Sequence, residues 1–164
     1  MKLNSCNEWD TLKTVILGTV DGFSPCLEIA DLSGHESLEC ASVIAKKAFP
    51  KWYLDEVKED LEGLSSIFKK AGVTVLRPNW SERSSLFQTP NWRASGFDIY
   101  NVRDNHIVFG NTLVVGASSS RSRQFESLAF QDIFYNYFFE EGFKWVCAPT
   151  PKLKGEYVHE IKRQ

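Results

Sequence analysis

One short segment occurs twice in this chain in closely similar form. Residues 68–78 read FKKAGVTVLRP and residues 138–149 read FFEEGFKWVCAP. Each copy has the end of an apolar helix, a glycine, a short strand-like run and a proline. A supersecondary unit of this kind leaves faces that it cannot cover alone, so it requires neighbouring units. The repeat, with a spacing of about 70 residues, predicts an α/β protein built from similar units, although two helix–strand pairs in an ordinary α/β sandwich give the same pattern.

The helical pattern is clear in both copies. Between residues 54 and 71 apolar side chains recur three or four positions apart, which is typical of an amphipathic helix, and Gly72 follows as its cap. A second helix is predicted over residues 123–141, with Ser118–Ser120 as its N-terminal cap. A short helix is also expected near residues 38–48.

Five runs rich in β-branched and aromatic residues predict strands. They span residues 11–18, 73–76, 106–109, 112–115 and 143–147. Gly110-Asn111 separates the third run from the fourth, and this dipeptide predicts a two-residue hairpin. Long loops are expected over residues 19–50 and 79–104, and loops of such length often shape a binding site.

These elements divide the chain into two units and a tail. Each unit has strands, then a helix, then a strand, and we expect the units to occupy residues 11–78 and 104–149. Together they form one domain over residues 1–151. Residues 152–164 are a polar tail.

The charge balance limits the classes of partner. Nineteen Lys and Arg against twenty-one Asp and Glu give a net charge of −2, so no overall field attracts nucleic acid or an anionic membrane. The N-terminus carries no apolar signal segment and no stretch reaches the length of a membrane span. We therefore expect a cytoplasmic protein that binds small neutral or zwitterionic molecules.

The four cysteines show no metal or disulfide spacing. Cys6, Cys26, Cys40 and Cys147 lack the CxxC pattern of a zinc ribbon, so we interpret them as reduced thiols. Cys26, His35 and Cys40 could be considered as metal ligands, but their spacing matches no common site and a fourth ligand is not evident. We expect neither a metal nor a cofactor.

Further motifs identify a family. NEWDTLKTVILG at 7–18, YNVRDNHIVFGN at 100–111, SRSRQFE at 120–126 and FKWVCAPTPKL at 143–153 occur in this order around the first repeat copy. Together they resemble the N-terminal part of the glycine (arginine:glycine) amidinotransferase family, within the pentein superfamily. The resemblance covers nearly the whole chain, apart from the loops at 19–50 and 79–96.

The resemblance implies a fold and a reaction. Penteins are α/β propellers with five ββαβ-type units around a pseudo-fivefold axis, of which this chain would contain about two. In the family a cysteine thiolate attacks the guanidinium carbon of L-arginine, ornithine leaves, and an acceptor amine takes the amidino group. Glycine is the commonest acceptor, and relatives use lysine or aminocyclitols.

The resemblance also places the bond-breaking residues outside the chain. The catalytic Asp, His and Cys of the family have no counterpart in residues 1–164. We therefore expect a fragment or truncated form that is inactive alone and that self-associates or associates with missing repeat units. A non-catalytic module that binds arginine-like ligands or a partner protein is the alternative.

Three residues are candidates for substrate binding. Asp104 in NVRD matches the family carboxylate that binds the substrate guanidinium, and a carboxylate suits the guanidinium fork well. Its alternative role is to cap a turn or to pair with Arg103. Arg121 and Arg123 stand near the predicted helix start, where a substrate carboxylate could bind. Their alternative role is an ion pair with Glu126 or with a neighbouring unit.

Other side chains have structural interpretations. Strand alternation would place Asp104, His106 and Val108 on one face, but we expect His106 to be structural or solvent-facing. Cys147 is expected to be inert at the end of a buried strand. An aromatic group is expected to form core or a docking face. It comprises Phe134, Tyr135, Tyr137, Phe138 and Phe139.

Overall fold

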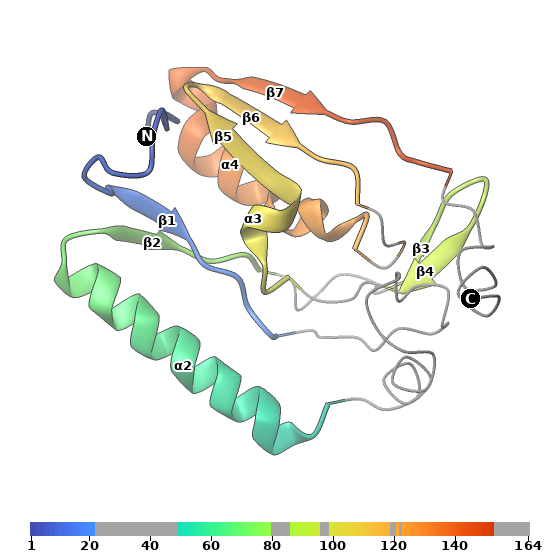
Figure 1. Cartoon of the computed structure of the whole chain (residues 1–164), viewed down its shortest axis with the longest axis horizontal. Helices are drawn as coiled ribbons and strands as arrows, with labels where there is room; N and C mark the ends of the chain where they lie inside the picture. The colour runs from blue at the N-terminus through green and yellow to red at the C-terminus, as the bar shows by residue number, and fades with distance from the viewer. Residues whose placement is uncertain (22–48, 80–85, 96–98, 119–120, 122, 153–164) are drawn as a thin grey trace, which may run out of the picture.

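The computed structural model describes residues 1–21, 49–79, 86–95, 99–118, 121 and 123–152. It shows two small sheets side by side, each with a helix packed on it (Figure 1). Among these residues no helix is both long and apolar enough to cross a membrane. The helix expected near residues 38–48 lies outside the described residues.

The first unit is a parallel βαβ arrangement. β1 (Thr14–Ile16) pairs in parallel with β2 (Thr74–Leu76), and α2 (Lys51–Lys70) connects them. A crossover helix is the usual way to join two parallel neighbours, because a tight turn cannot reverse the chain direction twice. Gly72 has a φ of 80° between α2 and β2, which is the left-handed backbone that glycine adopts without strain. The helix and both strands were predicted.

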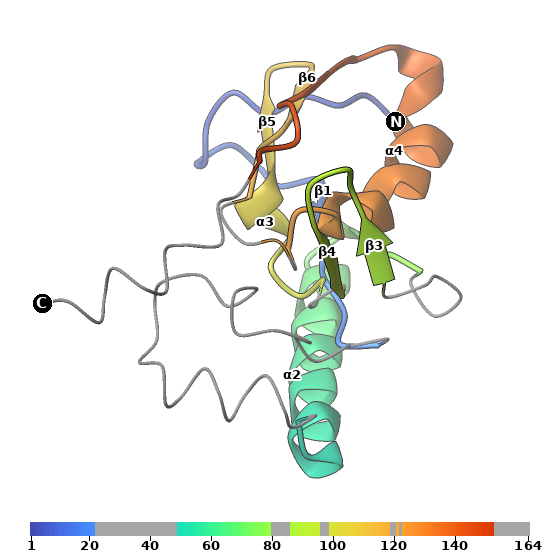
Figure 2. The same ribbon diagram turned by 90° about the vertical axis from the view of Figure 1, so that its right-hand side faces the viewer.

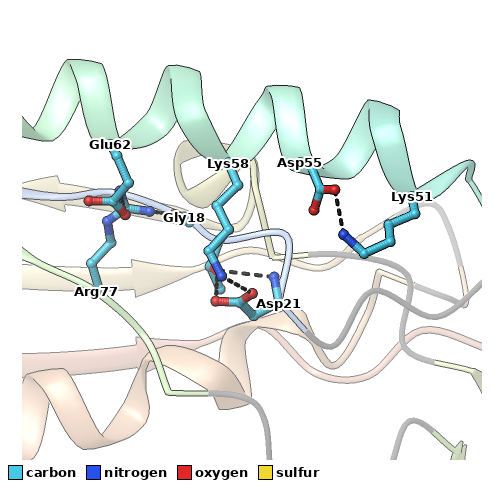
Figure 3. Close-up of polar contacts among 8 residues, drawn as sticks. Gly18, Asp21, Lys51, Asp55, Lys58, Glu62 and Arg77 are labelled. Atoms are coloured by element: carbon cyan, nitrogen blue, oxygen red, sulfur yellow. Dashed lines mark hydrogen bonds and ion pairs between the residues drawn. The ribbon is translucent and has the colours of Figure 1, made fainter.

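Polar side chains attach α2 to the ends of these strands (Figure 3). The Arg77 guanidinium donates to the Gly18 carbonyl at 2.7 Å, the Leu61 carbonyl at 3.0 Å and Glu62 Oε1 at 3.0 Å. Arg77 therefore joins the chain after β1, the chain after β2 and the middle of α2. These contacts provide a hydrogen-bond donor to one carbonyl oxygen after β1 and to one carbonyl oxygen in α2.

A second link closes the same region. Lys58 on α2 donates to Asp21 Oδ1 at 2.8 Å, and Thr19 Oγ1 donates to Asp21 Oδ2 at 3.2 Å. The hydrogen bond from Lys58 holds the pKa of Asp21 below its usual value, against a smaller opposing effect of burial. The link is half-exposed, so it adds little stability compared with the contacts of Arg77.

The second unit has the ββαβ order. β5 (His106–Phe109) and β6 (Thr112–Val115) form an antiparallel hairpin, and β6 pairs in parallel with β7 (Lys144–Cys147) in the sheet order β5-β6-β7. The predicted turn is confirmed, because Phe109 and Thr112 are register partners around Gly110-Asn111. Gly110 has a φ of 56°, the glycine conformation that such two-residue turns require. The unit boundaries and the count of two units stay predictions.

The helix predicted over residues 123–141 is wrong in extent. Only α4 (Gln131–Phe138) is α-helical, and the 3₁₀ segments η2 (Glu126–Phe130) and η3 (Phe139–Glu141) flank it. The tighter η2 turn places Glu126 and Ala129, three residues apart, on the buried side. Tertiary contacts of Glu126 thus override the local helical pattern. The Ser118 N–H donates to the Gln124 side chain at 2.9 Å, and Ser119 and Ser120 of the predicted cap lie outside the described residues.

The loop predicted over residues 79–104 contains regular structure. β3 (Leu86–Gln88) and β4 (Arg93–Ser95) form a small antiparallel hairpin, and α3 (Val102–Asn105) leads into β5. The three-residue strands are too short for periodicity to reveal them. Trp92 between them is buried, and its indole N–H donates to the Pro151 carbonyl at 3.3 Å. This distant contact explains why local sequence did not predict the hairpin.

One core serves both units. α4 covers one face of the β5-β6-β7 sheet (Figure 2), where Leu113, Phe130 and Phe134 are almost fully buried. Leu3 and Leu76 from the first part of the chain belong to the same buried cluster. The other buried members are Ile99, Val115, Ala129, Ile133 and Phe138. Of the five aromatic residues considered for α4 and η3, Phe134 and Phe138 are core, while Tyr135, Tyr137 and Phe139 are exposed.

The β7 strand differs from its prediction. We expected a buried strand, but β7 forms an edge of its sheet and Cys147 is exposed. β7 pairs only with β6 among the described strands, so one side of its backbone and most of its side chains face outward. An apolar run bounded by glycine and proline indicates a strand but does not distinguish an edge from a centre.

Candidate functional site

The candidate site begins at the junction of α3 and β5. Asp104 lies in α3, so the strand alternation that was expected to join Asp104, His106 and Val108 on one face begins only at His106. The Asp104 side chain is 52% exposed, whereas His106 is buried. The prediction of a shared face is therefore wrong, because the backbone is helical up to Asn105.

The Asp104 carboxylate binds a guanidinium of the same chain. Arg123 NH1 donates to Asp104 Oδ2 at 2.8 Å. Arg103, which was considered as the partner of Asp104, pairs with Glu8 instead. Arg123 follows β6 by several residues, so the contact joins the start of the hairpin to the segment that leads into η2.

Glu126 holds the other side of Arg123. Arg123 Nε lies 3.0 Å from Glu126 Oε1 and 3.1 Å from Oε2, and Arg123 NH2 lies 3.0 Å from Oε2. Asn105 Nδ2 donates to Glu126 Oε2 at 2.8 Å. The Glu126 side chain is 3% exposed. The ion pair with Glu126, the alternative role of Arg123, is thus present together with the contact to Asp104.

The electrostatics of Arg123 follow from these partners. Burial disfavours its charged form, but hydrogen bonding and attraction to Glu126, and then to Asp104, outweigh burial and raise the pKa of the guanidinium. Arg123 is therefore a permanent cation at any physiological pH. A buried carboxylate beside a permanent cation is stabilised as the charged form.

Arg121 lies two residues before Arg123 and is partly buried. Its carbonyl accepts the Gln124 N–H at 3.3 Å, and the Arg123 carbonyl accepts the Glu126 N–H at 3.2 Å. Backbone turns of this kind bring Arg123 and Glu126 to the same side. The binding role predicted for Arg121 stays a prediction.

His106 is a core residue of the sheet. Its Nδ1 lies 3.2 Å from the Val102 carbonyl, which makes Nδ1 the protonated nitrogen, and its ring packs on Phe130 and Phe134. Within the described part of the chain Nε2 is buried without a hydrogen-bond partner. Burial lowers the pKa of His106, partly opposed by the Val102 hydrogen bond. The geometry supports a structural neutral imidazole.

The described thiols lie apart from histidine. Cys6 and Cys147 are both free and exposed, and Cys26 and Cys40 lie outside the described residues. Cys147 is in register with Val115, which is in register with His106. Two strand spacings separate Cys147 from His106 by about 10 Å, which is too far for direct proton transfer.

Two members of this cluster were not predicted as site residues. The sequence predicts Glu126 only as an ion-pair partner of Arg123 and predicts no site role for Asn105. The spacing of Arg123 and Glu126 indicates an ion pair, but only burial of Glu126 and the approach of Asn105 show that the pair forms the interior of the site.

Comparison with known proteins shows which proteins this chain resembles. No family model matches the chain. Inosamine-phosphate amidinotransferase 1 of Streptomyces griseus is 38% identical over 152 residues, covering 90% of this chain and 43% of that protein. The chain resembles the N-terminal part of an amidinotransferase. The L-arginine:L-lysine amidinotransferase of Pseudomonas savastanoi pv. phaseolicola is 30% identical, over 93% of this chain and 42% of its own length.

Solved structures agree with this amidinotransferase resemblance. The inosamine-phosphate amidinotransferase of Streptomyces griseus superposes with a TM-score of 0.79 at 34% identity, over 94% of this chain and 45% of that chain. An amidinotransferase of the saxitoxin biosynthetic pathway of Microseira wollei gives a TM-score of 0.78 at 34% identity, over 92% and 44%. The fold is therefore the α/β pentein fold. The amidinotransferase-like chain spans less than half the length of these relatives.

Proposed function

We propose that this chain forms the guanidinium-binding part of an amidinotransferase that transfers an amidino group from L-arginine to an acceptor amine, such as glycine. The observation that carries the proposal is the Asp104 carboxylate, which is half-exposed and already accepts a hydrogen bond from a guanidinium, that of Arg123, at 2.8 Å. The similarity to amidinotransferases, one of them named for L-arginine, supports the same assignment.

The proposed roles follow the geometry of the cluster. Asp104 binds the substrate guanidinium, Arg123 holds Asp104 through Oδ2, and Arg121 is the remaining candidate for the substrate carboxylate. Hydrogen bonds between charged groups are stronger than those between neutral groups, and a carboxylate matches a planar guanidinium in both charge and shape. No cofactor is part of the proposal.

The proposed reaction needs a thiolate. The thiolate would attack the guanidinium carbon, ornithine would leave with the electron pair of the broken C–N bond and a proton, and the acceptor amine would then displace the thiolate. Among the described residues no cysteine contacts a histidine. We therefore propose that the 164-residue chain binds arginine without cleaving it, which also describes the second candidate function, a non-catalytic arginine-binding module.

Asp104→Asn tests the binding role. The substitution keeps the side-chain shape and removes the charge, so arginine affinity of the purified chain, measured by calorimetry, should fall by about 1.5–3 kcal/mol. Asp55→Asn is the matched control, because Asp55 is an exposed carboxylate on α2 that pairs with Lys51. Equal arginine affinity in wild type and Asp104→Asn would show that Asp104 only supports the turn.

A further inference from the structure

Three charged side chains of the candidate site carry a net negative charge. It contains two carboxylates, Asp104 and Glu126, and one guanidinium, Arg123. The neighbouring Arg103 is engaged by Glu8 at the exposed surface, so its charge is compensated separately and screened by water. Asp104, Glu126 and Arg123 together therefore carry one net negative charge.

The contacts show where this negative charge resides. Arg123 meets Glu126 through Nε and NH2 at 3.0–3.1 Å, in a pair whose Glu126 side chain is 3% exposed and whose Arg123 side chain is 23% exposed. It meets Asp104 through NH1 alone, and that carboxylate is half-exposed. Charges interact more strongly in the low-dielectric interior than at the surface. The Arg123 charge is therefore balanced mainly by Glu126, and the net negative charge stays at Asp104.

The burial of Glu126 requires that Arg123 balance Glu126 in preference to Asp104. A buried Glu126 without its cation would be strongly destabilised, so Arg123 cannot leave it to neutralise Asp104 fully. Asn105 donates to the same oxygen, Oε2, at 2.8 Å and helps fix the carboxylate. Asp104 Oδ1 accepts no hydrogen bond from the described residues, while Oδ2 is taken by Arg123.

We infer that Glu126 is a positioning residue that neutralises Arg123 and thereby leaves Asp104 free to bind one external guanidinium cation end-on through Oδ1. This inference rests on the proposed function, because it assumes that Asp104 faces the ligand. Without the Glu126 charge, Arg123 would satisfy Asp104 internally. The site would then hold no net charge and would lose its preference for a cation over a neutral molecule of the same shape.

Methylguanidinium and methylurea, its neutral isostere, are the probes. Wild type should bind methylguanidinium in preference to methylurea in calorimetry or NMR titration. Glu126→Gln keeps the length and an acceptor oxygen, so methylguanidinium affinity should fall about tenfold or more with methylurea affinity unchanged, as removal of a nearby charge at an effective dielectric constant of about 20 predicts. Glu140→Gln makes the same charge change at an exposed position of η3 and should leave both affinities unchanged.

A double substitution separates charge from shape. Arg123→Met with Glu126→Met replaces the buried pair by apolar side chains and leaves the Asp104 charge in place, so methylguanidinium affinity should stay within about threefold of wild type. Buried pairs replaced together by apolar residues often keep a protein folded, so this variant gives an answer even if Glu126→Gln does not fold. Circular dichroism checks the fold of each variant.

The outcomes distinguish the two proposals. Loss of methylguanidinium binding in Asp104→Asn and Glu126→Gln, with retention in the double variant, supports both. Loss in Asp104→Asn with wild-type affinity and selectivity in Glu126→Gln overturns the role of Glu126 and leaves the proposed function standing. Loss in the double variant also overturns the charge argument, since the net charge is unchanged there. Wild-type affinity in Asp104→Asn overturns the proposed function itself.

Discussion

Single residues set the close contacts of the fold. At Gly18 an added Cβ would lie 2.2 Å from the Tyr100 carbonyl oxygen and 2.3 Å from that of Ile99. These distances are below any real carbon–oxygen contact, and backbone cannot give way as a flexible side chain can. The Gly18 carbonyl also accepts the bond from Arg77. A glycine is required here by space.

Gly18→Ala is expected to lower the free energy of unfolding by about 2 kcal/mol or more, because the methyl group forces two backbone segments apart. Urea denaturation followed by circular dichroism measures the change. Gly63→Ala is the control: nothing lies within 4 Å of a Cβ at Gly63 in α2, and alanine should raise stability there by about 0.5–1 kcal/mol. Equal effects of the two substitutions would contradict the packing argument.

His106 makes stability depend on pH. Its pKa in the folded chain is below the ordinary value of 6.5, because burial between aromatic rings disfavours the imidazolium. The unfolded chain therefore binds the proton more readily, and stability must fall as the pH drops below 6.5 towards the folded pKa. Above 6.5 both states are neutral and this contribution is complete.

In a background with His35→Gln and His159→Gln, stability should decrease between pH 6.5 and pH 5 with a slope of at most about 1.4 kcal/mol per pH unit from His106. His106→Asn keeps an N–H that can donate to the Val102 carbonyl and should reduce this slope. Urea midpoints at several pH values measure it. A slope that persists unchanged after His106→Asn would assign the effect to carboxylates.

At the scale of elements, connections between helix and strand repeat in both units. Gly72 after α2 and Gly142 after η3 have φ values of 80° and 70°, and each precedes a strand that is parallel to an earlier one. The glycine ends the helix and directs the chain back along the sheet. What differs is how each helix is held. α4 buries large aromatic side chains, whereas α2 buries only Leu61 and Ser65 and depends on Arg77.

Arg77→Met should lower stability by about 2–4 kcal/mol, because the Gly18 and Leu61 carbonyls both lose their donor in a partly buried region. Thermal or urea unfolding measures this. Lys51→Met, in the exposed Lys51–Asp55 pair, is the matched control and should change stability by less than about 0.5 kcal/mol. If both substitutions had the same small effect, α2 would be held by its apolar face alone.

At the scale of the whole molecule, the N-terminal segment joins the two units. The N-terminal ammonium donates to the Tyr137 carbonyl at 2.6 Å, Ser5 bridges to Gly110 at the hairpin turn, and Leu3 lies in the core cluster of the second unit (Figure 1). The face of the β5-β6-β7 sheet that α4 does not cover carries the exposed side chains of Ile107 and Phe109.

The purified chain should release no ornithine from L-arginine in the presence of glycine or another amine. Covalent catalysis needs a thiolate with a base within about 3 Å, and in the described part of the chain neither exposed cysteine has a histidine beside it. Four variants, each with one cysteine replaced by alanine, are tested in the same ornithine-release assay as the wild-type chain. Turnover abolished by one particular variant would disprove the prediction and identify a nucleophile in this chain.

Local sequence was sufficient for the elements whose signals are local. α2, the Gly110-Asn111 hairpin and the glycines after each helix follow from helical periodicity, turn chemistry and left-handed backbone preference. Tertiary structure alone decided the rest. η2 replaces the expected helix because buried Glu126 binds Arg123 and Asn105. The β3–β4 hairpin depends on Trp92 and its contact with Pro151. β7 is an edge strand because of its place in the sheet order. These features arise from groups far apart in the chain, whose desolvation and hydrogen bonding outweigh the smaller local propensities.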